Sequence, residues 1–303
     1  MEITDWEQHR KHRTAVVEDE EQYVGLFDEA CQPLMDCPPV LSPLEAPQRR
    51  NVVTSFQATF AIMDQGAVHP IVDELVAGGA TVDHEGKLVG VANKTRFIVV
   101  ERHNYRRAFR ITHVVESGDW QHPHSLEVHG VDILAELDRH VAWSAPTTIT
   151  GEFTRFERDW VGPEGVAATW SKPRDLQDMK MITTADGVTL GDARREDEAT
   201  AEKVIRKLIT RSLETSWRAT GIRHIIENPP IVVSPYGSTL PSPNVLIRPA
   251  DGKLLETVAP IADAAGVSIT ASLWLPGDPP APGLDLSHPT IVIDVRQVTE
   301  VNQ

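Results

Sequence analysis

Cysteine is scarce in this sequence, which contains only Cys31 and Cys37 among its 303 residues. Two thiols cannot complete a four-ligand zinc site by themselves, so we do not expect a structural zinc module. Their short spacing around Pro33 leaves two interpretations open. They are either two reduced thiols, which is the commoner state, or the partners of a local disulfide across a turn.

Long apolar runs are missing as well. No stretch approaches the roughly 20 apolar residues that a membrane-spanning helix needs. The segment Met1–Glu21 is charged and lacks the apolar centre of a secretory signal. We therefore expect no association with a membrane, and we expect the protein to be made in the cytoplasm.

Positive charge is also in short supply. Lys and Arg together number 29 against 44 Asp and Glu, which makes the net charge −15. An acidic chain repels phosphate groups, so specific nucleic-acid binding is not expected. Aromatic residues make up only 6%, which argues against a dense aromatic binding surface. The hydrophobic share of 41% and the charged share of 24% are typical of a globular chain with a packed core.

Signatures of common enzymes are absent from the sequence. The segment GVANKT at 90–95 has a Lys-Thr pair but lacks the second glycine and the spacing of a phosphate-binding loop. No G-x-S-x-G, H-E-x-x-H or protein-kinase signature occurs. We therefore expect no enzymatic activity and no cofactor.

The best candidate for a chemical site is the run GDWQHPHSLEVHG, in which His122, His124, Glu127 and His129 fall within eight residues. Imidazole and carboxylate groups suit a divalent transition metal. On strands, alternate positions share a face, so His122 and His124 would point one way and Glu127 and His129 one way. The run distantly resembles the cupin motif H-x-H followed by an acid, although the spacing differs and Pro123 interrupts the pair. Histidines flanked by proline at a hairpin tip are more often solvent-exposed, and we favour that interpretation.

The first 145 residues contain several patterns of half-buried strands. In SFQATFAI, residues 55–62, Phe56 and Phe60 alternate with polar neighbours. Further β-rich runs lie at 95–101, 109–116 and 125–130, and short helices are indicated near 70–78 and 131–140. The first dozen residues are polar and suggest an arm. We predict a mainly β, split-barrel-like domain over residues 1–145.

Residues 146–303 show a different texture. A long amphipathic helix is predicted near 193–214, with acidic residues in its first turns and basic residues after them, as the helix dipole favours. Its apolar face comprises Ala201, Val204, Ile205, Leu208 and Leu213. A second predicted helix, LLETVAPIADAAG, contains Pro260 and precedes two strong strands. The predicted fold class is α+β, with a β-barrel-like N-terminal domain and a second mixed α/β domain.

Three stretches together resemble one known family. The first is VTSFQATFAIMD at 53–64, a "small-Phe-x-hydrophobic" strand, and the second is VHGVDILAELDRH at 128–140. The third is LLETVAPIADAAGVSI at 254–269, which leads into a strand of the type IVIDVR at 291–296. Their order and spacing are similar to those of the baseplate hub, or minor tail, proteins of siphophages that infect actinobacteria.

The resemblance implies a structural protein of the virion tail without catalytic residues. Such a protein is a homotrimer whose β-barrel domains form a ring matching the tail tube. It lies between the distal tail protein and the receptor-binding components, and it surrounds the end of the tape measure protein. The acidity of this chain suits a channel wall to which DNA should not adhere. Two alternatives stay open: a metal-dependent enzyme built around the His/Glu run, and a carbohydrate-binding module for the host wall.

Overall fold

The computed structural model describes residues 5–42, 44–64, 67–76, 80–82, 88–91, 94–118, 123–143, 153–158, 169–177, 200–245, 247 and 249–299. Contacts divide the chain into two compact units of three segments each. The first unit comprises Met1–Glu136, Asn228–Tyr236 and Ile269–Asp294, and the second comprises Leu137–Glu227, Gly237–Ser268 and Val295–Gln303. Residues that we expected in one C-terminal domain are therefore shared between the two units.

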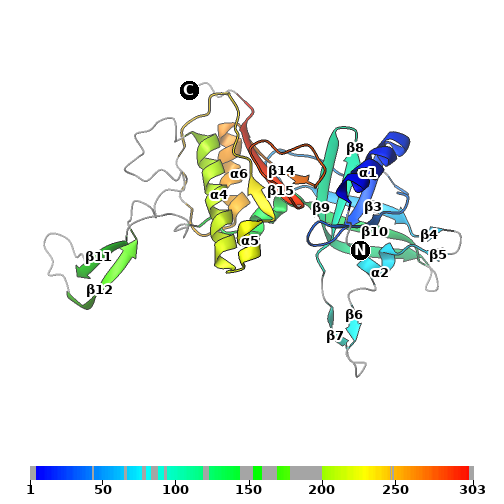
Figure 1. Ribbon diagram of the computed structural model, residues 1–303, viewed down its shortest axis with the longest axis horizontal. Coiled ribbons are helices and arrows are strands. Elements are labelled where there is room, and N and C mark those ends of the chain that lie inside the picture. The colour runs from blue at the N-terminus through cyan, green and yellow to red at the C-terminus, as the bar shows by residue number, and fades with distance from the viewer. Residues whose placement is uncertain are drawn as a thin grey trace. The chain divides into compact units, whose positions relative to one another are not determined.

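The first unit contains a six-stranded antiparallel sheet (Figure 1). Its strands, in spatial order, are β2 (Pro33–Asp36), β1 (Gln22–Phe27), β8 (Phe97–Arg102), β9 (Tyr105–Gly118), β10 (Pro123–Asp132) and β3 (Ser55–Ala61). The chain as a whole combines this large sheet with helices and smaller sheets, so the predicted α+β class is confirmed at this level.

Alternation of apolar and polar residues explains why β3 and β10 pair with one face in the core. In β3, Phe56, Ala58 and Phe60 are buried, and they alternate with exposed or half-buried polar residues. Leu126 and Val128 of β10 are fully buried and lie opposite Phe60 and Ala58 in the antiparallel register. The predicted strands at 55–62 and 125–130 are thus confirmed, and they supply the centre of the core.

The segment that follows the edge strand β2 forms backbone hydrogen bonds with the other edge strand, β3. We call residues 39–42 and 44–45 the bridging segment. Backbone hydrogen bonds to β3 run from Ala61 N to Pro39 O (2.9 Å), from Leu41 N to Thr59 O (2.7 Å), and between Glu45 and Gln57 in both directions (3.0 and 3.2 Å). No closed barrel is found among the described residues, because β2 and β3 remain the edges of the strand order.

A helix covers part of this sheet where a polar arm was expected. Helix α1 (Trp6–Glu20) is capped by Asp5, whose side chain accepts a hydrogen bond from Gln8 N at 2.9 Å, and it ends at Glu21 with φ 65°. It packs against β1. The expectation of an arm is wrong because the helix buries His9 and Arg13 rather than an apolar stripe.

Shorter elements belong to the first unit in whole or, for β14 and β15, in part. Helix α2 (Ile71–Leu75) buries Ile71 in the core. The strand β15 (Thr290–Gln297) lies between β14 (Val267–Trp274) and β13 (Ile231–Val233), and β13 runs parallel to β15. Two small hairpins pair β4 (Met63–Asp64) with β5 (Ala67–Val68), and β6 (Ala80–Val82) with β7 (Leu88–Val91).

The second unit contains the long helix α4 (Ala201–Ala219), which buries all five predicted apolar positions. It begins later and ends later than the predicted 193–214, and residues 193–199 lie outside the described ones. Helix α6 (Leu254–Ala265) packs against α4, includes Pro260 and ends at Gly266 with φ 70°. No described helix is both long and apolar enough to cross a membrane.

The remaining elements of the second unit are short. The 3-10 helix η2 (Ile133–Arg139) replaces the α-helix predicted near 131–140 and lies at the boundary of the two units. A hairpin pairs β11 (Phe153–Arg158) with β12 (Thr169–Gln177), and α5 (Arg223–Glu227) follows α4.

Candidate functional site

The predicted His/Glu run is only partly visible in the structure. His122 lies outside the described residues, and His124 is exposed on β10. Glu127 and His129 share one face, as predicted, and Nε2 of His129 lies 3.1 Å from Oε1 of Glu127. The described residues contain no group of three or more His, Cys, Asp or Glu side chains that could hold a metal ion.

The neighbours of His129 make this face a polar sheet surface. The rings of His129 and His113 stack with centroids 4.3 Å apart and planes inclined by 7°. Gln57 on β3 donates its side-chain amide to Oε1 of Glu127. The lone pair of a ring nitrogen lies in the plane of its ring. Because the two ring planes are nearly parallel and stacked, the lone pairs of the two imidazoles do not point at one common ion. A surface patch of hydrogen bonds explains this cluster better than a metal centre.

The two cysteines are free thiols. Burial raises the pKa of Cys31 to about 12. Burial, and next the charge of Asp36, raises the pKa of Cys37 as well. Because the thiolate is the nucleophile, neither cysteine is suited to nucleophilic chemistry at neutral pH.

The most organised set of charges in the first unit lies between α1, the β8–β9 hairpin and the loop between β14 and β15. We call Arg13, Glu101, Arg106 and Asp278 the buried charge cluster. The guanidinium of Arg106 donates to Glu101 at 3.1 and 3.2 Å and to Oδ1 of Asp278 at 3.1 Å, with a further bond to Oδ2. Arg13 is fully buried, but its nitrogens are 3.6 Å from Glu101 and 3.5 Å from Asp278.

The pKa shifts separate the two arginines of this cluster. Burial lowers the pKa of Arg106, but its hydrogen bonds to Asp278 and Glu101 outweigh that penalty and leave the pKa raised. Burial also opposes ionisation of Asp278, and the hydrogen bond from Arg106 overcomes it, so the pKa of Asp278 is lowered. The pKa of Arg13 is lowered, first by burial and then by repulsion from Arg106. Arg106 is therefore well matched to the cluster, whereas Arg13 is not.

A second buried ion pair joins β9 to the end of β10. Arg107 donates to Asp132, whose other oxygen accepts from Leu134 N at 3.0 Å at the start of η2. The guanidinium carbon of Arg107 also lies 5.6 Å from the ring centroid of Phe109. Burial raises the pKa of Asp132, and the hydrogen bond from Leu134 and the charge of Arg107 only partly offset this.

In the second unit, the carboxylate of Glu202 joins three segments that are far apart in the sequence. It accepts hydrogen bonds from Ser238 N at 3.0 and 3.1 Å, from Gln297 N at 2.6 Å and from Arg206 at 2.9 Å. Arg206 in turn donates to Val295 O at 2.5 Å. A buried carboxylate with this many donors holds the surrounding backbone in place.

These arrangements suit a role in holding segments together. In the described part of the chain, each buried carboxylate named above accepts hydrogen bonds from arginine or backbone donors. Taken by its sequence alone, the basic run RHNYRR at 102–107 is either a solvated hairpin tip or a contact for an acidic partner. It does form the β8–β9 turn, but Arg106 and Arg107 point inward to acids that the local sequence did not reveal. Comparisons of this chain with models of protein families and with curated proteins find no match.

Proposed function

We propose that this protein is a structural minor tail protein that forms the baseplate hub at the tip of a non-contractile phage tail. In this role it links the tail tube and the distal tail protein to the receptor-binding components, and it performs no catalysis. The observation that carries the proposal is the six-stranded sheet whose two edges are joined through the bridging segment. The similarity of three sequence stretches to hub proteins adds to it.

The three stretches occupy connected elements, which supports the resemblance. The stretch at 53–64 contains β3, and the stretch at 128–140 contains the end of β10 and η2; β3 and β10 pair with each other. The stretch at 254–269 comprises α6 and the start of β14, and 291–296 lies within β15. The first two stretches therefore lie on paired strands, and so do the last two, because β14 is the neighbour of β15.

A barrel-like first unit is the finer part of the proposal. The bridging segment continues from β2 and makes four backbone hydrogen bonds to β3, so only one irregular stretch separates the sheet from closure. Closure of a sheet removes its exposed edge strands, which otherwise can pair with strands of other chains and cause aggregation. A ring of such domains requires each subunit to present two complementary surfaces, because head-to-tail contacts generate the ring.

The buried charges and the exposed apolar side chains support a role in assembly. The buried charge cluster ties α1 and the β14–β15 loop to the β8–β9 hairpin, as expected of a part that must stay rigid. Leu41, on the bridging segment, is 61% exposed, and Tyr236 is 55% exposed. Large apolar side chains on a surface are candidates for contacts with neighbouring subunits. We propose a homotrimer, with the distal tail protein, the tape measure protein and other tail-tip proteins as partners.

The direct test is to locate the protein in particles of the phage that encodes it. Antibodies raised against the purified chain and carrying gold should label the tail tip in electron micrographs. Labelling of the capsid, or a protein missing from purified particles by mass spectrometry, would contradict the proposal. In solution, a mass of three times 33.5 kDa would support the trimer.

The described residues do not favour the two alternatives. A metal-dependent enzyme would need ligands that converge, and His129 stacks on His113 instead. A carbohydrate-binding module would need exposed tryptophans on a sheet face, and the tryptophans whose side chains are described are half-buried. Both alternatives remain predictions that metal analysis and glycan-binding assays can test.

A further inference from the structure

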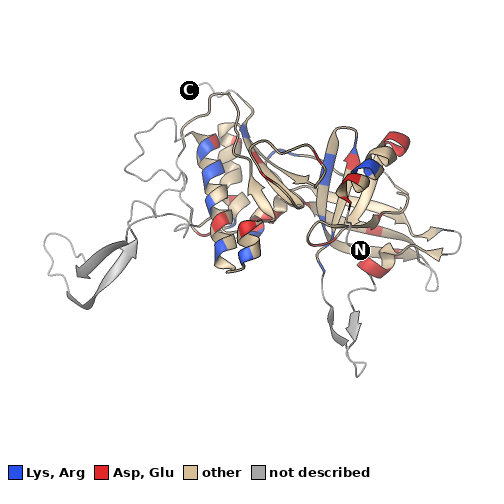
Figure 2. Ribbon diagram, viewed as in Figure 1, with Lys and Arg blue, Asp and Glu red and all other residues tan. Residues whose placement is uncertain are grey.

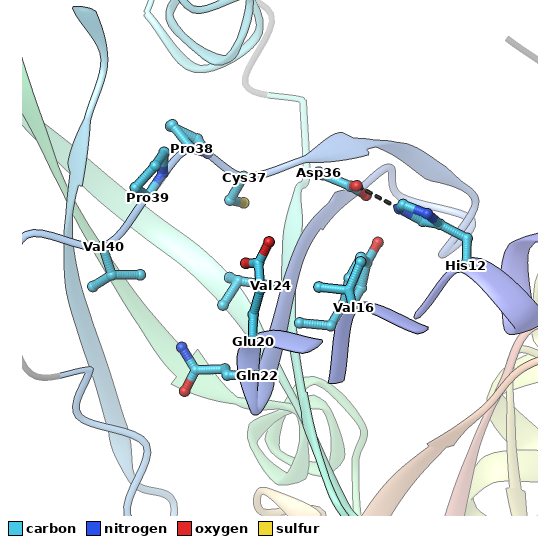
Figure 3. Close-up of a pocket in the computed structure, with 11 residues that line it drawn as sticks. His12, Val16, Glu20, Gln22, Val24, Asp36, Cys37, Pro38, Pro39 and Val40 are labelled. Atoms are coloured by element: carbon cyan, nitrogen blue, oxygen red, sulfur yellow. Dashed lines mark hydrogen bonds and ion pairs between the residues drawn. The ribbon is translucent and has the colours of Figure 1, made fainter. Parts of the chain in front are cut away.

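A pocket of about 490 Å³ lies in the first unit, beside the second half of α1 (Figure 3). It is bounded by α1, by β1 and by the chain from the end of β2 into the bridging segment. Its volume falls within the range of pockets that hold small ligands or the side chains of a partner. No part of the proposed hub function uses it.

The lining of the pocket is mixed, with apolar side chains beside polar and acidic ones. Val16, Val24 and Val40 contribute methyl groups, and Pro39 contributes its ring. Such walls favour an aliphatic occupant, because burying its methylene groups removes apolar surface from water.

Two carboxylates border the pocket, and they differ in how they are engaged. Oδ2 of Asp36 lies 2.6 Å from Nε2 of His12, as the dashed line in Figure 3 marks. The side chain of Glu20 lines the same pocket and makes no hydrogen bond or ion pair with any residue that the structure describes. The pocket therefore offers one carboxylate already paired with histidine and one that is available to a ligand.

The helix end beside the pocket strengthens its negative potential. Glu18, Asp19 and Glu20 occupy the last turn of α1, which contains no basic residue. Figure 2 shows this acidic end of α1. The C-terminal end of a helix already carries partial negative charge, so acids there are unfavourable unless a cation is near.

We propose that this pocket receives a lysine or arginine side chain from a basic segment of a partner protein. The aliphatic stem of the side chain packs against the valines and Pro39, and the cationic head lies beside Glu20 and Asp36. Long cationic side chains bury their stems in this way while they keep the charged head near water. A basic partner complements the charge at the pocket better than a second copy of a chain with net charge −15.

The test uses three blocked tripeptides and the full chain. The probes are acetyl-Leu-Lys-Leu-amide, the same peptide with norleucine in place of lysine, and the same peptide with glutamate. Titrations are followed by methyl NMR signals of Val16, Val24 and Val40, which should shift, while the core methyls of Val100 should not. The lysine peptide should bind more tightly than the norleucine peptide by up to about fivefold, the upper end for a partly exposed ion pair. The glutamate peptide should not bind, and added salt should weaken the lysine peptide.

Matched variants locate the effect in the pocket. Glu20→Gln should weaken the lysine peptide by up to about fivefold and leave the norleucine peptide unchanged. Glu18→Gln makes the same charge change on the same helix, outside the pocket lining, and should weaken the lysine peptide clearly less than Glu20→Gln does while leaving the norleucine peptide unchanged. Equal binding of the lysine and norleucine peptides, equal effects of both variants, or shifts confined to other methyl groups would overturn the proposal. Self-association that is lost in Glu20→Gln would identify a second copy as the occupant and would overturn it as well.

Discussion

Replacing each arginine of the buried charge cluster by methionine should change stability by very different amounts. Arg106 donates to both Glu101 and Asp278, so Arg106→Met leaves two partly or fully buried carboxylates without their main partner. Breaking a buried ion pair from one side costs about 3–5 kcal/mol. The free energy of unfolding should fall by about that amount.

Arg13→Met should be nearly neutral or stabilising. The side chain of Arg13 is 1% exposed, and its nearest carboxylate oxygens are 3.5 and 3.6 Å away, too far for strong hydrogen bonds. Its Nε has no hydrogen-bond partner among the described residues. Its lowered pKa shows that burial and repulsion by Arg106 outweigh attraction to the two acids. Methionine retains the length and apolar stem, so the free energy of unfolding should fall by less than about 1 kcal/mol, or rise.

Urea denaturation of the wild type, both single variants and the double variant measures this contrast. Circular dichroism reports the midpoint, and an unchanged m value shows that the same structure unfolds. The double variant gives the coupling between the two arginines, which repulsion predicts to be unfavourable in the wild type. If Arg13→Met costs more than about 2 kcal/mol, Arg13 contributes a net attraction and the reasoning fails.

Two further perturbations test other parts of the structure. A Cβ added at Gly237 would lie 1.7 Å from Oε1 of Glu202, so Gly237→Ala should lower the free energy of unfolding by about 2–4 kcal/mol in urea denaturation. A Cβ added at Gly252 would lie 3.6 Å from its nearest neighbour, Oγ1 of Thr257, so Gly252→Ala should change the free energy of unfolding by less than about 1 kcal/mol. Equal losses in the two glycine variants would contradict the role given to Glu202. Burial lowers the pKa of His9 from 6.5 to about 4. Below pH 6.5 the histidine is protonated in the unfolded chain but not in the folded one, so stability is lost as the pH falls from about 6.5 to about 4. That loss is about 2 kcal/mol at pH 5 and should be absent in His9→Phe. The free energies of unfolding of the wild type and of His9→Phe are compared at each pH. If the difference between them does not change with pH, His9 is not buried as a neutral imidazole.

The elements that the sequence predicted well are those whose signal is local. Strand β3 alternates apolar and polar residues over its whole length, and α4 places five apolar residues on one face. Helix α6 has an apolar stripe and a stop at Gly266. In each case the residues that specify the element are neighbours in the sequence, so periodicity alone identifies it.

Helix α1 escaped prediction because its buried side chains are polar. His9 lies among the rings of Trp6, Tyr23 and Phe27, at centroid distances of 5.8, 6.2 and 5.9 Å. Arg13 is buried against acids rather than against apolar residues. A hydrophobicity pattern cannot register a helix that docks through an imidazole and a guanidinium, and the polar composition therefore suggested an arm.

The polar clusters escaped prediction because their members are distant in the sequence. Arg106 and Asp278 are 172 residues apart, and Glu202 and Gln297 are 95 apart. The residues around Arg106 in the sequence do not reveal that it is buried, whereas Arg102 of the same run is exposed and donates to Gln22. The His/Glu run shows the reverse case, because Glu127 and His129 lie 3.1 Å apart on one face of β10 but no third ligand joins them among the described residues.

These long-range contacts bear on how the first unit is constructed. Asp278, which holds Arg106, belongs to a segment that enters the first unit after the chain has passed through the second. The same segment supplies Ile269, whose backbone N–H donates to the side chain of Asn51 at 2.6 Å. A fragment that ends at residue 145 would keep Arg13, Arg106 and Glu101 and would lose the second carboxylate of the cluster, that of Asp278. The predicted boundary at residue 145 therefore separates Arg106 from Asp278, and the first unit needs the segment Ile269–Asp294 to pair its buried charges.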